Sequence, residues 1–90
     1  MAQAIVDPAE LRRFAQNLKR FNTDLHSSMA VLHGQLVGLG DTWRDQEHVR
    51  FRQEFEETMH VIERFMEAAN HHIAFLLHKA ERVEEYLQQR

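Results

Sequence analysis

The sequence predicts an all-α fold, an antiparallel two-helix hairpin that dimerises into a four-helix bundle. Three observations predict it. Two long segments carry apolar residues at helical spacing, a short turn-forming stretch separates them, and together they hold more apolar rows than one helix pair can cover. With 90 residues the chain is one domain, residues 1–90. We expect a first helix over about 7–38, a turn over 39–45 and a second helix over about 46–88.

The composition excludes several classes of protein. Hydrophobic residues make up 43% and charged residues 28%, which is typical of a folded chain. The net charge of −3 offers no basic footprint for nucleic acid, and the absence of cysteine excludes disulfides and thiolate metal sites. No apolar run approaches the ~20 residues that cross a bilayer. We therefore expect no membrane insertion and a cytoplasmic protein, or one secreted without a Sec signal peptide.

The first helix opens with a strong start signal. Asp7 can accept a backbone N–H as N-cap, Pro8 suits the first helical position and Glu10 has a place in a capping box. Apolar residues then recur in alternating steps of three and four, which predicts a heptad seam. The seam comprises Leu11, Phe14, Leu18, Phe21, Leu25, Ser28, Leu32 and Leu39, and the row beside it comprises Ala15, Asn22, Met29 and Leu36.

The turn carries two of the three glycines, Gly38 and Gly40, and the only tryptophan, Trp43. Glycine favours a reversal of direction because it adopts positive φ without steric cost. The start of the second helix stays open between two interpretations. Thr42 and Asp45 have capping-box spacing, and Asp45 can also cap the helix itself.

The second helix predicts a partner chain, because its apolar rows exceed what one neighbouring helix covers. Each exposed Leu or Phe forfeits ~1.5–3 kcal/mol, and a contiguous apolar surface marks an interaction site. A second hairpin with two-fold symmetry completes the interior. The seam comprises Phe51, Phe55, Thr58, Ile62, Phe65, Ala69, His72, Leu76, Lys79, Val83 and Leu87; Met59, Met66, Ile73 and Ala80 flank it, and Val61, Ala68 and Phe75 form a third row. We expect the dimer interface at Phe55, Ile62, Phe65, Ala69, Ile73 and Leu76.

The unequal helix lengths predict an overhang. Folding the chain about residue 42 sets Asp7 opposite Leu77, so residues 80–90 would extend about three turns beyond the first helix. In an antiparallel dimer this tail, with Tyr86 and Leu87, reaches the partner's turn beside Trp43. Trp43 itself has two interpretations: a cap that plugs the open end of the helix pair, and an exposed aromatic group that a partner recognises.

Catalytic and metal chemistry find no support in the motifs. No phosphate-binding glycine loop and no nucleophile–base pair occurs, so we expect no enzyme and no cofactor. The seven histidines suggest a metal or pH role, but none has the spacing of a zinc or di-iron helix motif. His33 and His48 could meet across the hairpin without further ligands, and His72 is expected to be partly buried or to contact the dimer partner.

Trp43, Asp45 and Phe51 carry a family resemblance. An aromatic residue eight positions after the tryptophan of a turn, between two long helices, resembles the WXG, or ESAT-like, family of small type VII secretion proteins. Asp45 stands where the family has glycine, and Arg90 stands where the acid of the family's Tyr-Xaa-Xaa-Xaa-Asp/Glu export signal would follow Tyr86. The resemblance implies a dimer with itself or a paralogue. It also implies a recognition surface made by the turn and the partner's Tyr86 region, and a secretion ATPase as a further partner.

Three hypotheses for function remain at this point. The first is a secretion-linked helical dimer. The second is a generic helical adaptor or antitoxin-like binding module with no link to export. The third is a histidine-dependent bundle that responds to metal or acid.

Overall fold

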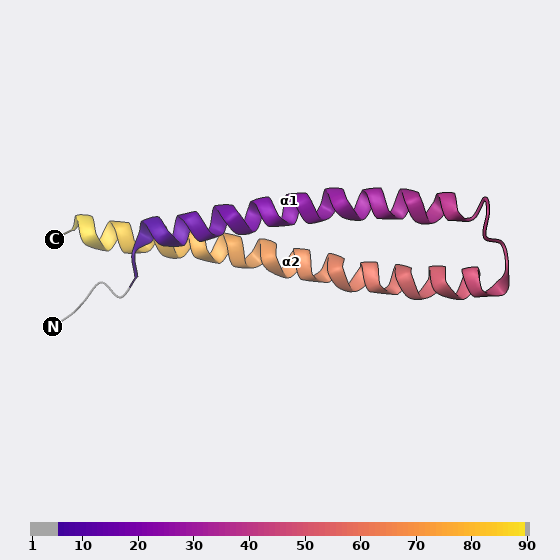
Figure 1. Cartoon of the computed structure of the whole chain (residues 1–90). Coiled ribbons are helices and arrows are strands. Elements are labelled where there is room, and N and C mark those ends of the chain that lie inside the picture. Colours follow the sequence, from indigo (N-terminus) through magenta and orange to yellow (C-terminus); the bar gives the residue numbers. More distant parts are fainter. Residues whose placement is uncertain (1–5, 90) are drawn as a thin grey trace.

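Two helices joined by a short turn make up the fold. The computed structural model describes residues 6–89, in which α1 (Pro8–Leu39) and α2 (Gln46–Gln88) lie antiparallel (Figure 1). The expected all-α hairpin is confirmed, and α1 begins and ends one residue later than expected. The start signal of α1 acts as its residue types suggest: Asp7 Oδ1 accepts the Ala9 N–H at 2.9 Å, and Pro8 is the first helical residue.

The hairpin is a rod. Its principal extents are 68 × 17 × 14 Å and its radius of gyration is 20.4 Å, whereas a compact domain of this length has about 12 Å. Its accessible surface is 7434 Å², against about 5,500 Å² for an ordinary folded monomer of 10.7 kDa. The chain therefore exposes roughly 1,900 Å² more than its mass requires.

The helices meet along their small side chains. Buried apolar residues are Ala15, Met29, Leu36, Ala69 and Ala80, and none of the large side chains in residues 6–89 is fully buried. The central row of α1 is thus the one predicted to lie beside the seam, while Phe14 and Phe21 of the predicted seam are 59% and 53% exposed. Small side chains occupy the contact because they let the helix axes approach, whereas phenylalanine rings would hold the axes apart.

A buried asparagine lies in the middle of this contact. Asn22 Nδ2 donates to the Met66 carbonyl at 3.1 Å and to Asn70 Oδ1 at 3.2 Å. Both acceptors belong to α2, so the amide links the helices at one position along the rod. A polar group at a helix contact fixes register because a shifted pairing would leave it unpartnered.

The register corrects the predicted overhang. Arg12 of α1 forms a two-pronged ion pair with Glu84, with Arg12 Nη2 2.7 Å from Glu84 Oε1, and Ala80 is 0% exposed. The N-terminal part of α1 therefore reaches α2 as far as Glu84, and a shorter segment of α2 projects past it (Figure 1). The cause is that side chains lean toward the N-terminus of their own helix. In an antiparallel pair, the tilt of the side chains on each helix shifts the contacts of a given α1 residue toward later residues of α2.

We predict that Ala80→Leu lowers the free energy of unfolding by about 1–3 kcal/mol, because the buried contact has no room for the added atoms. Denaturant unfolding measures the change. Ala74→Leu is the matched control, since Ala74 is exposed on the same helix and the substitution should change stability by about 0.5 kcal/mol or less. Equal effects of the two substitutions would contradict the packing described here.

The Arg12–Glu84 pair should make stability depend on pH. Hydrogen bonds from the Arg12 guanidinium, and also its charge, lower the pKa of the Glu84 carboxyl. The pair therefore stabilises the folded state above about pH 4.3, the ordinary glutamate pKa, and this contribution is lost as the pH falls through the lowered value.

We accordingly expect Glu84→Gln to be less stable than the wild type in denaturant unfolding at about pH 7, and the difference to disappear once the pH is below the lowered pKa of the Glu84 carboxyl. Glu85→Gln is the control, because Glu85 is an exposed neighbour without an ion pair among residues 6–89. A stability difference for Glu84→Gln that persists unchanged at low pH would show that the ion pair is not its source.

Candidate partner-binding surface and turn

The turn reverses the chain without any positive φ. No residue of 6–89 has positive φ, so the expected left-handed glycine is wrong. The end of α1 instead continues into a turn made by backbone hydrogen bonds between residues three apart. The Trp43 N–H then donates to the Leu39 carbonyl at 2.8 Å. Gly40 lies in a close-packed place: an added Cβ would be tight against the Val37 carbonyl oxygen, at 3.2 Å, and in ordinary contact with His48 Cε1, at 3.6 Å.

Asp45 is the N-cap of α2, which settles the choice between Thr42 and Asp45. Its backbone is extended, with φ −89° and ψ −178°, and Asp45 Oδ1 accepts the His48 N–H at 3.0 Å. Thr42 instead lies within the turn, where its N–H donates to the Leu39 carbonyl at 3.1 Å. The aspartate thus provides a side-chain cap that glycine could not. Its negative φ is one that any residue can adopt.

An aromatic cluster covers the turn end of the hairpin. Trp43 packs on Phe51, with 5.7 Å between ring centroids, and Phe51 packs on Phe55 at 5.8 Å. The Trp43 ring also lies 5.1 Å from that of His48, which is 8% exposed and whose Nε2 has no hydrogen-bond partner among residues 6–89. Trp43 is half-buried and Phe51 is 40% exposed. The cluster therefore plugs the turn and still presents aromatic edges to solvent.

One side of the rod is apolar. We call it the apolar face, and it is held together across the helices by Phe21 and Phe65, whose rings meet edge to face at 6.2 Å between centroids. The exposed side chains that form it are Phe14, Phe21, Leu32, Val61, Phe65 and Phe75. Such a contiguous exposed surface is typical of a site that another molecule covers.

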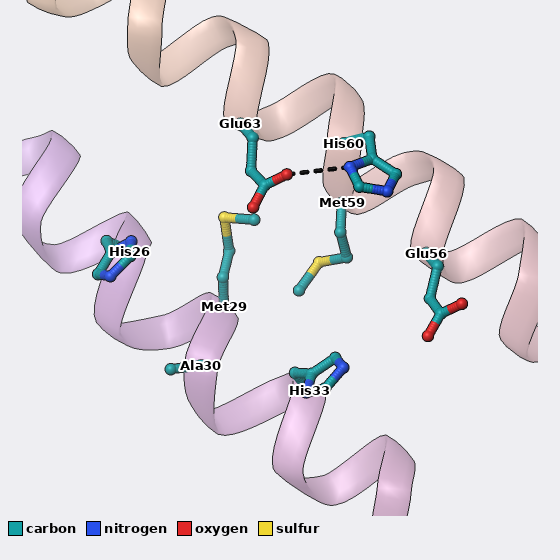
Figure 2. Close-up of a pocket in the computed structure, with 8 residues that line it drawn as sticks. All are labelled: His26, Met29, Ala30, His33, Glu56, Met59, His60 and Glu63. Carbon is teal, nitrogen blue, oxygen red and sulfur yellow. Dashed lines mark hydrogen bonds and ion pairs between the residues drawn. The ribbon is translucent and has the colours of Figure 1, made fainter.

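The opposite side carries a polar groove. A space of about 450 Å³ lies between the helices, and Figure 2 shows Met29 and Met59 pointing into it with histidines and carboxylates around them. Its lining residues are His26, Met29, Ala30, His33, Glu56, Met59, His60 and Glu63. His60 Nδ1 lies 3.0 Å from Glu63 Oε1. The histidines and carboxylates that line the groove distinguish this side of the hairpin from the apolar face.

Three of the histidines, His26, His33 and His60, line the polar groove. His33 lines the polar groove, whereas His48 is buried beside Trp43, so the possible pairing across the hairpin is not formed. His72 is exposed in the single hairpin. Within residues 6–89 no group of three or more His, Asp or Glu side chains is placed to hold a metal ion.

The residues predicted for a dimer interface fall into three groups. Phe65 is exposed on the apolar face, while Ala69 is 2% exposed and packs inside the hairpin. The other four, which are half-buried at the edge of the helix contact, are Phe55, Ile62, Ile73 and Leu76. The sequence interpretation did not include Phe14, Phe21 or Phe75 in the interface. Their size was the available signal, because rings too large for a close helix contact stay outside.

The end of α2 holds the predicted tail residues. Tyr86 is 57% exposed, Leu87 is half-buried, and α2 ends at Gln88. Arg90, which takes the place of the acid in the export signal, lies outside the described residues. Neither α1 nor α2 has a stretch that is both long and apolar enough to span a bilayer.

Comparison with known proteins agrees with this geometry. Residues 3–86 match the WXG100 family, described as proteins of 100 residues with WXG. No curated protein and no solved structure gives a significant match. The match covers α1, the Trp43 turn and α2 as far as Tyr86, and the chain therefore belongs to the WXG100 family.

Proposed function

We propose that this chain is a non-enzymatic, partner-binding hairpin of a type VII-like secretion system, acting as a small substrate, a partner of one or a structural component. The observation that carries the proposal is the apolar face of a chain that belongs to the WXG100 family. A second hairpin over that face would complete a four-helix bundle. The turn cluster would then form a recognition surface together with the partner's tail.

Area supports a partner of this size. Obligate dimers bury about 2,000–5,000 Å² in total, half of it on each chain. The roughly 1,900 Å² by which one hairpin exceeds an ordinary monomer falls within the corresponding share of about 1,000–2,500 Å² for each chain. The polar groove on the opposite side would remain in water, where its histidines and carboxylates are solvated.

A generic helical adaptor is the second candidate. Asp45 in place of the family's glycine and Arg90 in place of the acid of the export signal favour a relative that has left secretion. Export decides between the two. In the first case the chain, or a complex that contains it, leaves the native host cell only when the secretion ATPase is present. In the second it stays inside the cell with or without the ATPase.

We predict that Phe65→Asp weakens association at least about a hundredfold, because each of two paired chains loses an apolar contact and gains a buried charge. Sedimentation at micromolar concentration should show a smaller helical species or aggregates. Leu76→Asp should weaken association too and also destabilise the hairpin, since Leu76 is half-buried between the helices.

Asn70→Asp is the matched control for Phe65→Asp. It adds the same charge one turn away, on the polar side, and it keeps the oxygen that accepts from Asn22. This variant should associate like the wild type. Unchanged association of Phe65→Asp would place the partner on another face.

We expect Trp43→Ala to keep the helix content seen by circular dichroism and to abolish ATPase-dependent export. Trp43 contributes to the turn cluster but to neither helix, so its loss removes a recognition group rather than an element. Asp41→Ala, at an exposed turn position, should be exported normally. A collapse of helix content in Trp43→Ala would instead assign the tryptophan a structural role, and normal export would remove it from recognition.

A further inference from the structure

Two rows of α2 lie outside the helix contact and run the length of the apolar face. Residues seven apart lie on one line of a helix that packs with a 3.5-residue period. The first outer row comprises Phe51, Thr58, Phe65, His72, Lys79 and Tyr86, and the second comprises Glu54, Val61, Ala68, Phe75 and Arg82. All of these residues are exposed except Lys79, which is half-buried.

The second outer row is symmetric in its chemistry. Ala68 stands at its centre, Val61 and Phe75 stand seven residues to either side, and Glu54 and Arg82 stand fourteen residues to either side. The row therefore reads acid, apolar, small, apolar, base. Neither Glu54 nor Arg82 has an ion-pair partner within residues 6–89. A copy of the row running in the opposite direction would place base opposite acid at both ends.

We propose that α2 packs antiparallel against α2 of a second copy of this chain, with the two helices crossing at Ala68. Glu54 of each chain then faces the partner's Arg82, and Val61 faces the partner's Phe75. Alanine at the crossing lets the axes approach to about 8 Å, the lower end of helix-pair distances. This inference rests on the proposed function, because it names the occupant of the apolar face.

The charge order selects both the orientation and the partner. A parallel pair would set Glu54 against Glu54 and Arg82 against Arg82, and like charges at a helix interface repel. A paralogue would need charged residues placed to complement Glu54 and Arg82. The second outer row of this chain already complements a second copy of itself. The complementarity thus favours a second copy running in the opposite direction.

The first outer row agrees with the same crossing. Antiparallel pairing about Ala68 brings Phe65 beside the partner's His72, and it brings Phe51 beside the partner's Tyr86. Phe51 belongs to the turn cluster with Trp43. One arrangement therefore covers the apolar face and also joins the turn of each chain to the tail of the other.

Charge reversal tests the pairing. Glu54→Arg and Arg82→Glu should each weaken self-association about tenfold, because two attractive contacts per dimer become repulsive. The double variant should return to within about threefold of the wild type. An equimolar mixture of the two single variants should form heterodimers in preference to either homodimer. The control is Glu67→Arg, which makes the same charge change beside the polar groove and should leave association unchanged.

A cysteine at the crossing tests the register. The chain has no cysteine, so Ala68→Cys introduces a single thiol. It should form a disulfide-linked dimer under mild oxidation, because a bridge needs Cβ atoms about 3.5–4.5 Å apart. Ala30→Cys, at an exposed position lining the polar groove, should not. Linkage of both variants alike, or of neither, would overturn the crossing at Ala68.

The outcomes separate this inference from the proposed function. A chain that stays monomeric alone overturns pairing with a second copy, and the apolar face is then left for a different chain. A dimer that ignores both charge reversals overturns the antiparallel contact of α2 with α2, although the hairpin still dimerises. In both cases ATPase-dependent export of the wild type would leave the proposed function standing.

Discussion

The close contact of two helices along small side chains sets the character of this molecule. Ala15, Ala69 and Ala80 let the helices approach, and Asn22 holds their register through two hydrogen bonds. A single stripe of this kind has room for alanine, methionine and leucine, whereas Phe14, Phe21, Phe65 and Phe75 stay outside it. The exposed rings are thus a consequence of how the hairpin closes, and they are the basis of the proposal that another chain covers them.

Much of the fold could be predicted from the sequence. The Asp7-Pro8 start has a local physical cause that operates as the residue types indicate. The position of the turn around Trp43 was predicted as well, but its backbone conformation was not. The inward-facing row could not be predicted from periodicity, because neighbouring rows of each helix are similarly apolar. Side-chain size decides between Ala15 and Phe14, and a pattern of apolar spacing carries no information on size.

The site was predicted less completely. Trp43, Asp45 and Phe51 gather at the turn, but the reason for Gly40 is close packing against Val37 and His48 rather than positive φ. The overhang was overestimated because residue counting ignores the lean of side chains along each helix. Glu54 and Arg82 were missed as candidate interface residues. Their meaning emerges only when the rows outside the helix contact are known.

The measurement that tests the central claim most directly is the native mass of the untagged chain across a concentration series, made with an apolar dye present. The account predicts a particle of twice 10.7 kDa at micromolar concentration, with dye binding rising as dilution uncovers the apolar face. A particle of 10.7 kDa that remains soluble at millimolar concentration and binds no dye would contradict it. In that result the hairpin would shield its own rings and would need no other chain.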